Sequence, residues 1–132
     1  EFAKKHKIKF LIGDEIDVLG RLITGMKKVN ANILFRVTSE NPFVYWEGID
    51  NLIKNHIDGN FDLSFYGGLP VGSSYEIVSL NSLKFSHKHG TKKHRSEYST
   101  LYIYENKKYF KINRLEPKKS ANNIFIKIAL TL

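Results

Sequence analysis

Polar side chains with ligand chemistry follow a strongly apolar stretch in the first third of the chain. Residues 33–38, ILFRVT, are typical of a strand that is buried on both faces, and Glu40 and Asn41 come shortly after it. In open α/β sheets, ligands bind beyond the carboxyl ends of the strands. A carboxylate there can ligate Mg²⁺, and the N-terminus of a following helix favours anions. The simpler alternative is that Glu40 only lies near the positive end of that helix.

A second group of candidate residues lies in the segment DEIDVLGR, residues 14–21. It follows an expected strand and begins an expected helix, which is the same topological position as that of Glu40. Asp17 and Arg21 are four residues apart, so they can pair on one exposed helical face. The functional alternative is that Arg21 contacts a phosphate or a base.

The other motifs indicate chemistry only weakly. The stretch 67–72, GGLPVG, has no Gly-Lys-Ser/Thr and is either a substrate-facing loop or a plain connection. His87, His89 and His94 are close in sequence but lack a metal-ligand spacing, so we expect them in an exposed loop. His56 lies on the apolar side of its expected helix and is expected to be packed. No G-x-S-x-G nucleophile elbow is present.

The elements that must position these residues follow from hydrophobic periodicity and from capping residues. Strands alternate with helices in the first half, which favours a mostly parallel sheet with helices on both faces, an α/β fold. The second half is less regular and indicates an antiparallel excursion. We expect strands at residues 7–12, 33–38, 61–66, 75–80, 109–114 and 124–132, and helices at 14–29, 41–58, 81–88 and 96–105.

Composition bounds the class of protein. The chain has 132 residues, 42% hydrophobic and 26% charged, which is typical of one globular domain. It has no cysteine, so disulfides, thiolate metal sites and a cysteine nucleophile are excluded. No apolar run is long enough to cross a bilayer, and no secretory signal is present, so we expect a cytoplasmic protein without a membrane partner.

A formal net charge of +8 suggests polyanionic partners such as nucleic acid or phosphorylated small molecules. The lysines, however, are scattered along the chain in pairs and form no basic stripe with interleaved aromatic residues. A solvated lysine-rich surface is the favoured interpretation, and specific binding of nucleic acid is the hypothesis we rank last.

Several segments taken together resemble the cytidylyltransferase-like family. They are GDEIDVLGR, ILFRVTSENPF, LPVGSSYEIVS, HRSEYSTLYIYEN and the closing ALTL, and together they run from residue 13 to residue 132. The branch that they resemble is the spore coat polysaccharide biosynthesis protein F group, which is related to the acylneuraminate and 3-deoxy-manno-octulosonate cytidylyltransferases. The resemblance implies a nucleotide-diphospho-sugar transferase fold of the glycosyltransferase A type. It also implies transfer of CMP from CTP to a sugar acid or related acceptor in polysaccharide biosynthesis, with Mg²⁺ and release of pyrophosphate.

The resemblance assigns expected roles to matching residues. Glu40 stands where the family has the Asp that holds the metal, and Arg36 beside it matches a catalytic position. Asp17, Arg21 and Asn41 match the segments near the nucleotide. The acceptor substrate is expected at the following positions: Glu76, Arg95 and Glu97. Relatives pair through the region that matches residues 75–116, so a homodimer is expected.

Two departures from the family pattern lead to an alternative. The phosphate-binding loop that opens the family is missing, and the second metal carboxylate would come just after Leu132. The chain is therefore expected to be a single, incomplete nucleotidyltransferase domain, truncated at both ends and inactive alone. The alternative is a non-catalytic binding or assembly module with the same fold.

Overall fold

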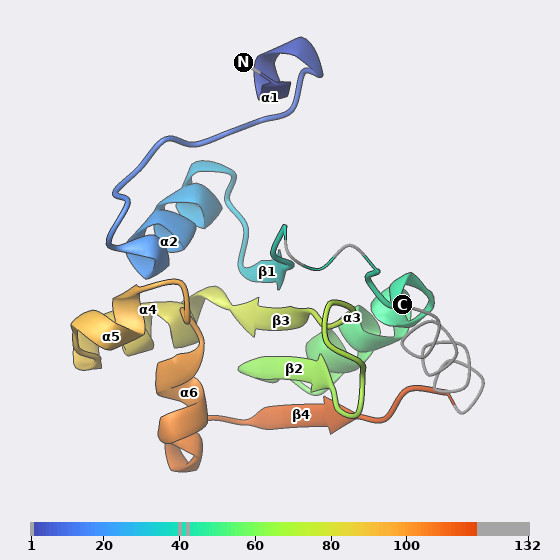
Figure 1. The fold of residues 1–132 in the computed structure, drawn as a ribbon. Coiled ribbons are helices and arrows are strands. Elements are labelled where there is room, and N and C mark those ends of the chain that lie inside the picture. The colour runs from blue at the N-terminus through green and yellow to red at the C-terminus, as the bar shows by residue number, and fades with distance from the viewer. Residues whose placement is uncertain (1, 40, 42, 119–132) are drawn as a thin grey trace.

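The computed structural model of the protein describes residues 2–39, 41 and 43–118, and its centre is a four-stranded sheet (Figure 1). The strands are β1 (Ile33–Arg36), β2 (Leu63–Tyr66), β3 (Glu76–Ser79) and β4 (Ile112–Leu115). They lie in the order β1-β3-β2-β4. The strand expected at residues 124–132 lies outside the described residues.

The expectation of a mostly parallel sheet is wrong. β3 pairs antiparallel with both β1 and β2, and only β2 and β4 pair in parallel. β1 and β2 are not neighbours in the sheet, because the position between them is left open. After β2 the chain turns back, and β3 occupies this position. A short connection favours an antiparallel neighbour, because parallel pairing needs a crossover of a dozen or more residues. The result is a mixed sheet in which β1, β2 and β4 point the same way.

Helices pack on both faces of this sheet. Two buried clusters show this, because neighbouring residues of β3 enter different clusters. Val78 packs with Leu19 of α2 (Val18–Lys28) and Leu83 of α4 (Leu80–His89), whereas Ile77 packs with Leu52 of α3 (Ile49–Asp58). The remaining helical segments are α1 (Phe2–Lys5), η1 (Trp46–Gly48), α5 (Lys92–Arg95), α6 (Leu101–Glu105) and η2 (Lys107–Tyr109).

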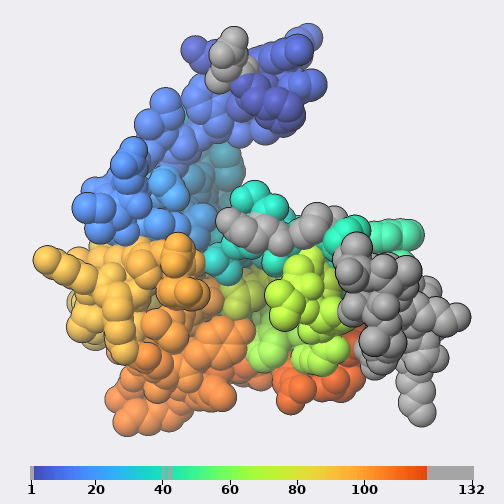
Figure 2. Space-filling view, in the orientation of Figure 1, coloured from blue at the N-terminus to red at the C-terminus, as the bar shows by residue number. Residues whose placement is uncertain are grey.

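The N-terminal segment differs from its expected structure. Residues 8–14 form no strand, and Ile8, Phe10 and Ile12 are at least half exposed. Their β-forming composition does not suffice, because no strand in the described part of the chain pairs with them. In Figure 2 the part of the chain that forms α1 projects away from the sheet and the other helices, in agreement with the absence of buried residues in α1.

Three helix starts were also wrongly expected. The helix expected from residue 96 begins only at Leu101, as α6, and Ser96 instead follows the end of α5. α2 begins at Val18 with Asp17 as its N-cap, whereas Asp14 caps the preceding turn through the backbone N–H groups of Ile16 and Asp17. The helix expected from residue 41 begins only at η1. The backbone of residues 43–45 instead donates hydrogen bonds to Gly72 and Ser73, which are far along the chain.

No helix in the described residues is long and apolar enough to span a bilayer.

Candidate functional site

Arg36 and Glu76 form the centre of the candidate site. They lie opposite each other in the β1–β3 pair, at the edge of the sheet where β1 ends and β3 begins. Arg36 Nη1 donates to Glu76 Oε2 over 3.0 Å, and Arg36 Nη2 donates to the backbone oxygen of Glu97 over 2.9 Å. Both side chains of the ion pair are largely shielded from solvent, with exposed fractions of 22% and 15%. The structure therefore brings together two residues that the sequence placed in different parts of the site.

The other partners of Glu76 are Thr100, the N-cap residue of α6, and Tyr104 within α6. Thr100 Oγ1 lies 3.1 and 3.0 Å from the two carboxylate oxygens, and the Tyr104 hydroxyl donates to Oε1 over 2.9 Å. Burial, and next the charge of Glu76, raise the pKa of Tyr104 far above its usual range, so its hydroxyl remains a donor at neutral pH. Because both oxygens of Glu76 accept hydrogen bonds within the chain, its carboxylate holds Arg36 in place.

Asn41 is brought to the same edge by the glycine-rich loop. Its side-chain Nδ2 donates to the backbone oxygen of Ser74 over 2.7 Å. Gly68 and Gly72 have φ values of 70° and 87°, which side chains rarely adopt, so glycine permits the path of this loop. The expected loop at residues 67–72 is thus present, and it lies beside the segment that carries Asn41.

A cavity of about 250 Å³ opens between these groups. Arg36, Asn41, Glu76 and Tyr104 contribute to its wall, together with Tyr75. The Tyr75 hydroxyl is buried and has no hydrogen-bond partner among the described residues.

The expected metal site is not formed by the described residues. Glu40, the expected Mg²⁺ ligand, lies outside them. Within the described part of the chain, no three histidine, aspartate or glutamate side chains are grouped so that they could hold a metal ion. Both oxygens of the Glu76 carboxylate already accept hydrogen bonds, from Arg36, Thr100 and Tyr104. The described residues therefore do not fit Mg²⁺ by themselves.

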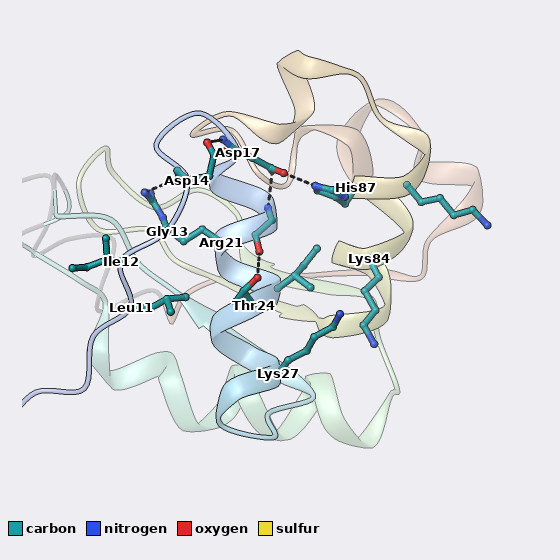
Figure 3. A pocket seen from close by; sticks show the side chains of 13 residues that line it. Leu11, Ile12, Gly13, Asp14, Asp17, Arg21, Thr24, Lys27, Lys84 and His87 are labelled. Atoms are coloured by element: carbon teal, nitrogen blue, oxygen red, sulfur yellow. Dashed lines mark hydrogen bonds and ion pairs between the residues drawn. The ribbon is translucent and has the colours of Figure 1, made fainter.

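Asp17 and Arg21 lie away from this cavity, at the N-terminal end of α2 (Figure 3), and Arg95 is bonded to His87, the partner of Asp17. Asp17 Oδ1 accepts from the Gly20 N–H over 2.8 Å, and Oδ2 lies 2.6 Å from His87 Nε2. Arg21 Nη1 donates to the backbone oxygen of Asp14, not to the Asp17 carboxylate. The expected Asp17–Arg21 pair is thus replaced by an Asp17–His87 pair, which connects α2 to α4.

The charge state of Asp17 reflects these contacts. Burial by itself would raise the pKa of Asp17, but the hydrogen bonds from His87 and from the Gly20 N–H lower it below its ordinary value, helped by the charge of Arg95. Arg95 also donates to the backbone oxygen of His87 over 3.1 Å, and its Nε is buried without a partner in the described residues. Asp17 is therefore a charged link between two helices.

Three expectations for site residues are changed by these contacts. His87 and His89 lie in α4, which extends to His89, and His94 lies in α5 and is buried, so none of the three lies in an exposed loop. Glu97 reaches the site through its backbone oxygen, and its side chain is exposed. Thr100 and Tyr104 were missed, although the spacing in TLYIY places them on one helical face. His56 is packed as expected, with its Nδ1 2.8 Å from the Ser64 hydroxyl.

Fold and site thus define an α/β protein with a polar cavity beyond the ends of its strands. Residues 1–129 match the family described as Cytidylyltransferase, so the chain belongs to the cytidylyltransferase family. It is 30% identical over 130 residues to an uncharacterized protein of Methanocaldococcus jannaschii, covering 98% of this chain and 54% of that protein. It is 29% identical over 113 residues to the spore coat polysaccharide biosynthesis protein SpsF of Bacillus subtilis, covering 85% of this chain and 47% of that protein. The chain spans about half the length of the curated relatives it matches.

Solved structures share the fold. A cytidylyltransferase from Leptospira borgpetersenii serovar Hardjo-bovis matches with a TM-score of 0.77 and 20% identity, over 88% of this chain and 51% of that chain. The CMP:2-keto-3-deoxy-manno-octonic acid synthetase complexed with CTP matches with a TM-score of 0.61 and 11% identity, over 98% of this chain and 76% of that chain. The family resemblance predicted from the sequence is thereby confirmed.

Proposed function

We propose that the protein is a cytidylyltransferase that transfers CMP from CTP to a sugar acid or a related hydroxyl compound in polysaccharide biosynthesis. Family membership supports the reaction class. The relative named for spore coat polysaccharide biosynthesis supports the process. The structural neighbour complexed with CTP supports the nucleotide.

The observation that carries this proposal is the convergence of Arg36, Asn41 and Glu76 on one cavity. Arg36 and Asn41 come from the end of β1, and Glu76 comes from the start of β3, forty residues after Arg36. The family resemblance assigns Arg36 to a catalytic position, Asn41 to the nucleotide and Glu76 to the acceptor. The side chains of Asp17, Arg21, Arg95 and Glu97 do not line this cavity, and their contacts with nucleotide or acceptor stay predictions from the family resemblance.

The chemistry proposed for the cavity is charge stabilisation and positioning. The acceptor hydroxyl oxygen attacks the α-phosphorus of CTP, the bond from this phosphorus to the β-phosphate oxygen breaks, and pyrophosphate leaves with the electron pair. The hydroxyl proton passes to a base or to water. Phosphoryl-transfer enzymes act mainly by holding the phosphates and neutralising their charge. Arg36 has N–H groups beyond those bonded to Glu76 and Glu97, and they are available to a phosphate.

Calorimetric titration with CTP in a Mg²⁺-containing buffer tests the proposal. We expect saturable binding by the wild-type protein. Arg36→Ala and Glu40→Ala are each expected to weaken it by about tenfold or more, because Arg36 is the proposed phosphate contact and Glu40 is the proposed ligand of the Mg²⁺ that accompanies CTP. Unchanged affinity in both variants contradicts the proposed site, and no binding by the wild-type protein contradicts the proposed substrate.

A second measurement separates the enzyme from the alternative binding module. Pyrophosphate release is followed with CTP and a panel of sugar acids. Release that depends on the sugar acid is expected for the enzyme, whereas binding of CTP without release is expected for a non-catalytic module.

A further inference from the structure

A groove between α2 and α4 is a separate feature of the molecule (Figure 3). It has a volume of about 480 Å³ and is lined by residues of both helices and of the segment before α2. None of its lining residues lines the cavity at Arg36 and Glu76. The groove is therefore a second place where a ligand can bind.

The two carboxylates at the groove are already hydrogen-bonded within the chain. Asp14 Oδ1 accepts from the backbone N–H groups of Ile16 and Asp17 over 2.7 and 2.9 Å, and these bonds lower the pKa of Asp14. Asp17 is bonded to the Gly20 N–H and to His87. Neither carboxylate forms an ion pair with a lysine of the groove among the described residues.

The lysines of the groove have no such partner. Lys27 of α2 and Lys84 and Lys88 of α4 line it, and none of the three forms an ion pair within the described part of the chain. Lys84 and Lys88 are four residues apart, so they lie one turn apart on one helical face, where like charges repel. In Figure 3 the side chains of Lys27 and Lys84 extend into the space between the two helices. The repulsion between these exposed charges is weak, and it is relieved when an anion binds near the ammonium groups.

We propose that this groove binds an oligoanion that carries two or more phosphate groups. Lysine ammonium groups on two neighbouring helices match several phosphates better than a single one. Arg21 also contributes to the lining, with its guanidinium bonded to the backbone oxygen of Asp14. Apolar side chains of Leu11 and Ile23 contribute to the lining, so a ring attached to the phosphates also finds a surface. The ligand is either an inorganic oligophosphate or the phosphate chain of a nucleotide.

Calorimetric titration with sodium tripolyphosphate at constant ionic strength tests the groove directly. We expect saturable binding by the wild-type protein. Lys27→Glu and Lys84→Glu are each expected to weaken it by about tenfold or more, because a charge-assisted bond is replaced by repulsion. Lys107→Glu is the matched control, since Lys107 is exposed, lies in η2 and does not line the groove. This control makes the same change in net charge and is expected to alter the affinity by less than about twofold.

Three outcomes overturn the proposal: no saturable binding by the wild-type protein, equal weakening by all three variants, or weakening by none of them. Lys27→Gln and Lys84→Gln replace the charge-reversal variants if circular dichroism shows that either one is unfolded, and each is expected to weaken binding by about threefold or more. Titration with CTP distinguishes the two sources of phosphate. An equal effect of Lys84→Glu on both ligands indicates a nucleotide, and an effect on tripolyphosphate alone indicates a separate oligophosphate. Because this experiment does not involve Arg36 or Glu40, it can succeed or fail independently of the proposed function.

Discussion

Arg36 and Glu76 are directly opposed in the antiparallel pair of β1 and β3, and their side chains form an ion pair of 3.0 Å. The two residues are forty positions apart, so only the insertion of β3 beside β1 brings them together. Glu76 also binds Thr100 and Tyr104 of the segment that forms α6. One carboxylate thus ties the sheet to a helix at the mouth of the proposed site.

Glu76→Gln is expected to destabilise the protein by about 1–3 kcal/mol, because the partly buried guanidinium of Arg36 loses its charged partner. Urea unfolding measures this change in the free energy of unfolding. Glu116→Gln is the matched control, since Glu116 forms a similar pair with Arg114 that is mostly exposed. The control is expected to cost less than about 1 kcal/mol. An equal decrease in the free energy of unfolding in the two variants would show that the partly buried ion pair does not stabilise the protein more than the exposed one.

Asn41→Ala is expected to release the glycine-rich loop, because the bond from Asn41 to the backbone of Ser74 is lost. The backbone N–H groups of Phe43 and Tyr45, which donate to the same loop, are expected to exchange faster with solvent. Hydrogen exchange followed by NMR measures this. Asn55→Ala removes a similar side-chain-to-backbone bond within α3 and is expected to leave these two groups unchanged. Unaltered exchange in Asn41→Ala would mean that the loop holds its position without this side chain.

Asp17→Ala is expected to cost about 1 kcal/mol at neutral pH, because it removes the N-cap of α2. The pKa of Asp17 is lowered in the folded protein from its ordinary value of 3.8, so its charge stabilises the fold above that pH. This stabilisation is lost as the pH falls through the lowered pKa. Urea unfolding at neutral and acidic pH is expected to show a difference between wild type and variant that shrinks in acid. A difference that is constant with pH would exclude the charge as its source.

Burial lowers the pKa of His56 from its ordinary value of 6.5, and the charge of Asp62 offsets this only in part. The unfolded chain therefore takes up a proton at a higher pH than the folded protein does. We expect stability to be full above pH 6.5 and to fall as the pH decreases below it. Thermal unfolding as a function of pH measures this slope.

His56→Gln is expected to flatten the slope, because the buried titrating group is removed. His89→Gln, at an exposed position in the last turn of α4, is the matched control and is expected to retain it. A slope that persists unchanged in His56→Gln would refute the assignment to this residue.

Several elements followed from local pattern alone. Steps of three and four between apolar residues predicted the buried face of α2, and Leu19, Ile23 and Met26 are buried. Ile16, expected on the same face, is 81% exposed because the helix begins two residues after it. β2 and β3 lie within the stretches predicted for them, since β-forming residues there are bounded by glycine, proline and capping residues.

Pairing partners did not follow from local pattern. The segment at residues 7–12 has the composition of a strand, and residues 8–12 have no regular structure. A strand depends on hydrogen bonds to a neighbour distant in sequence, and composition does not identify that neighbour. The expectation of a mostly parallel sheet was wrong because the order of paired strands is also a contact between distant segments. The contact of His87 with Asp17, seventy residues away, could not be predicted from local pattern either.

The sequence by itself determined the family, the helical and strand-forming stretches and the identity of residues such as Arg36, Asn41 and Glu76, because residue types and their order carry that information. Only the tertiary structure decided which of these residues meet. In the folded protein Arg36 pairs with Glu76, whereas Asp17 and Arg21 lie elsewhere. The lysines Lys27, Lys84 and Lys88 of α2 and α4 line one groove. The physical reason is that periodicity acts over a few residues, whereas contacts across a sheet or between helices depend on how distant segments pack.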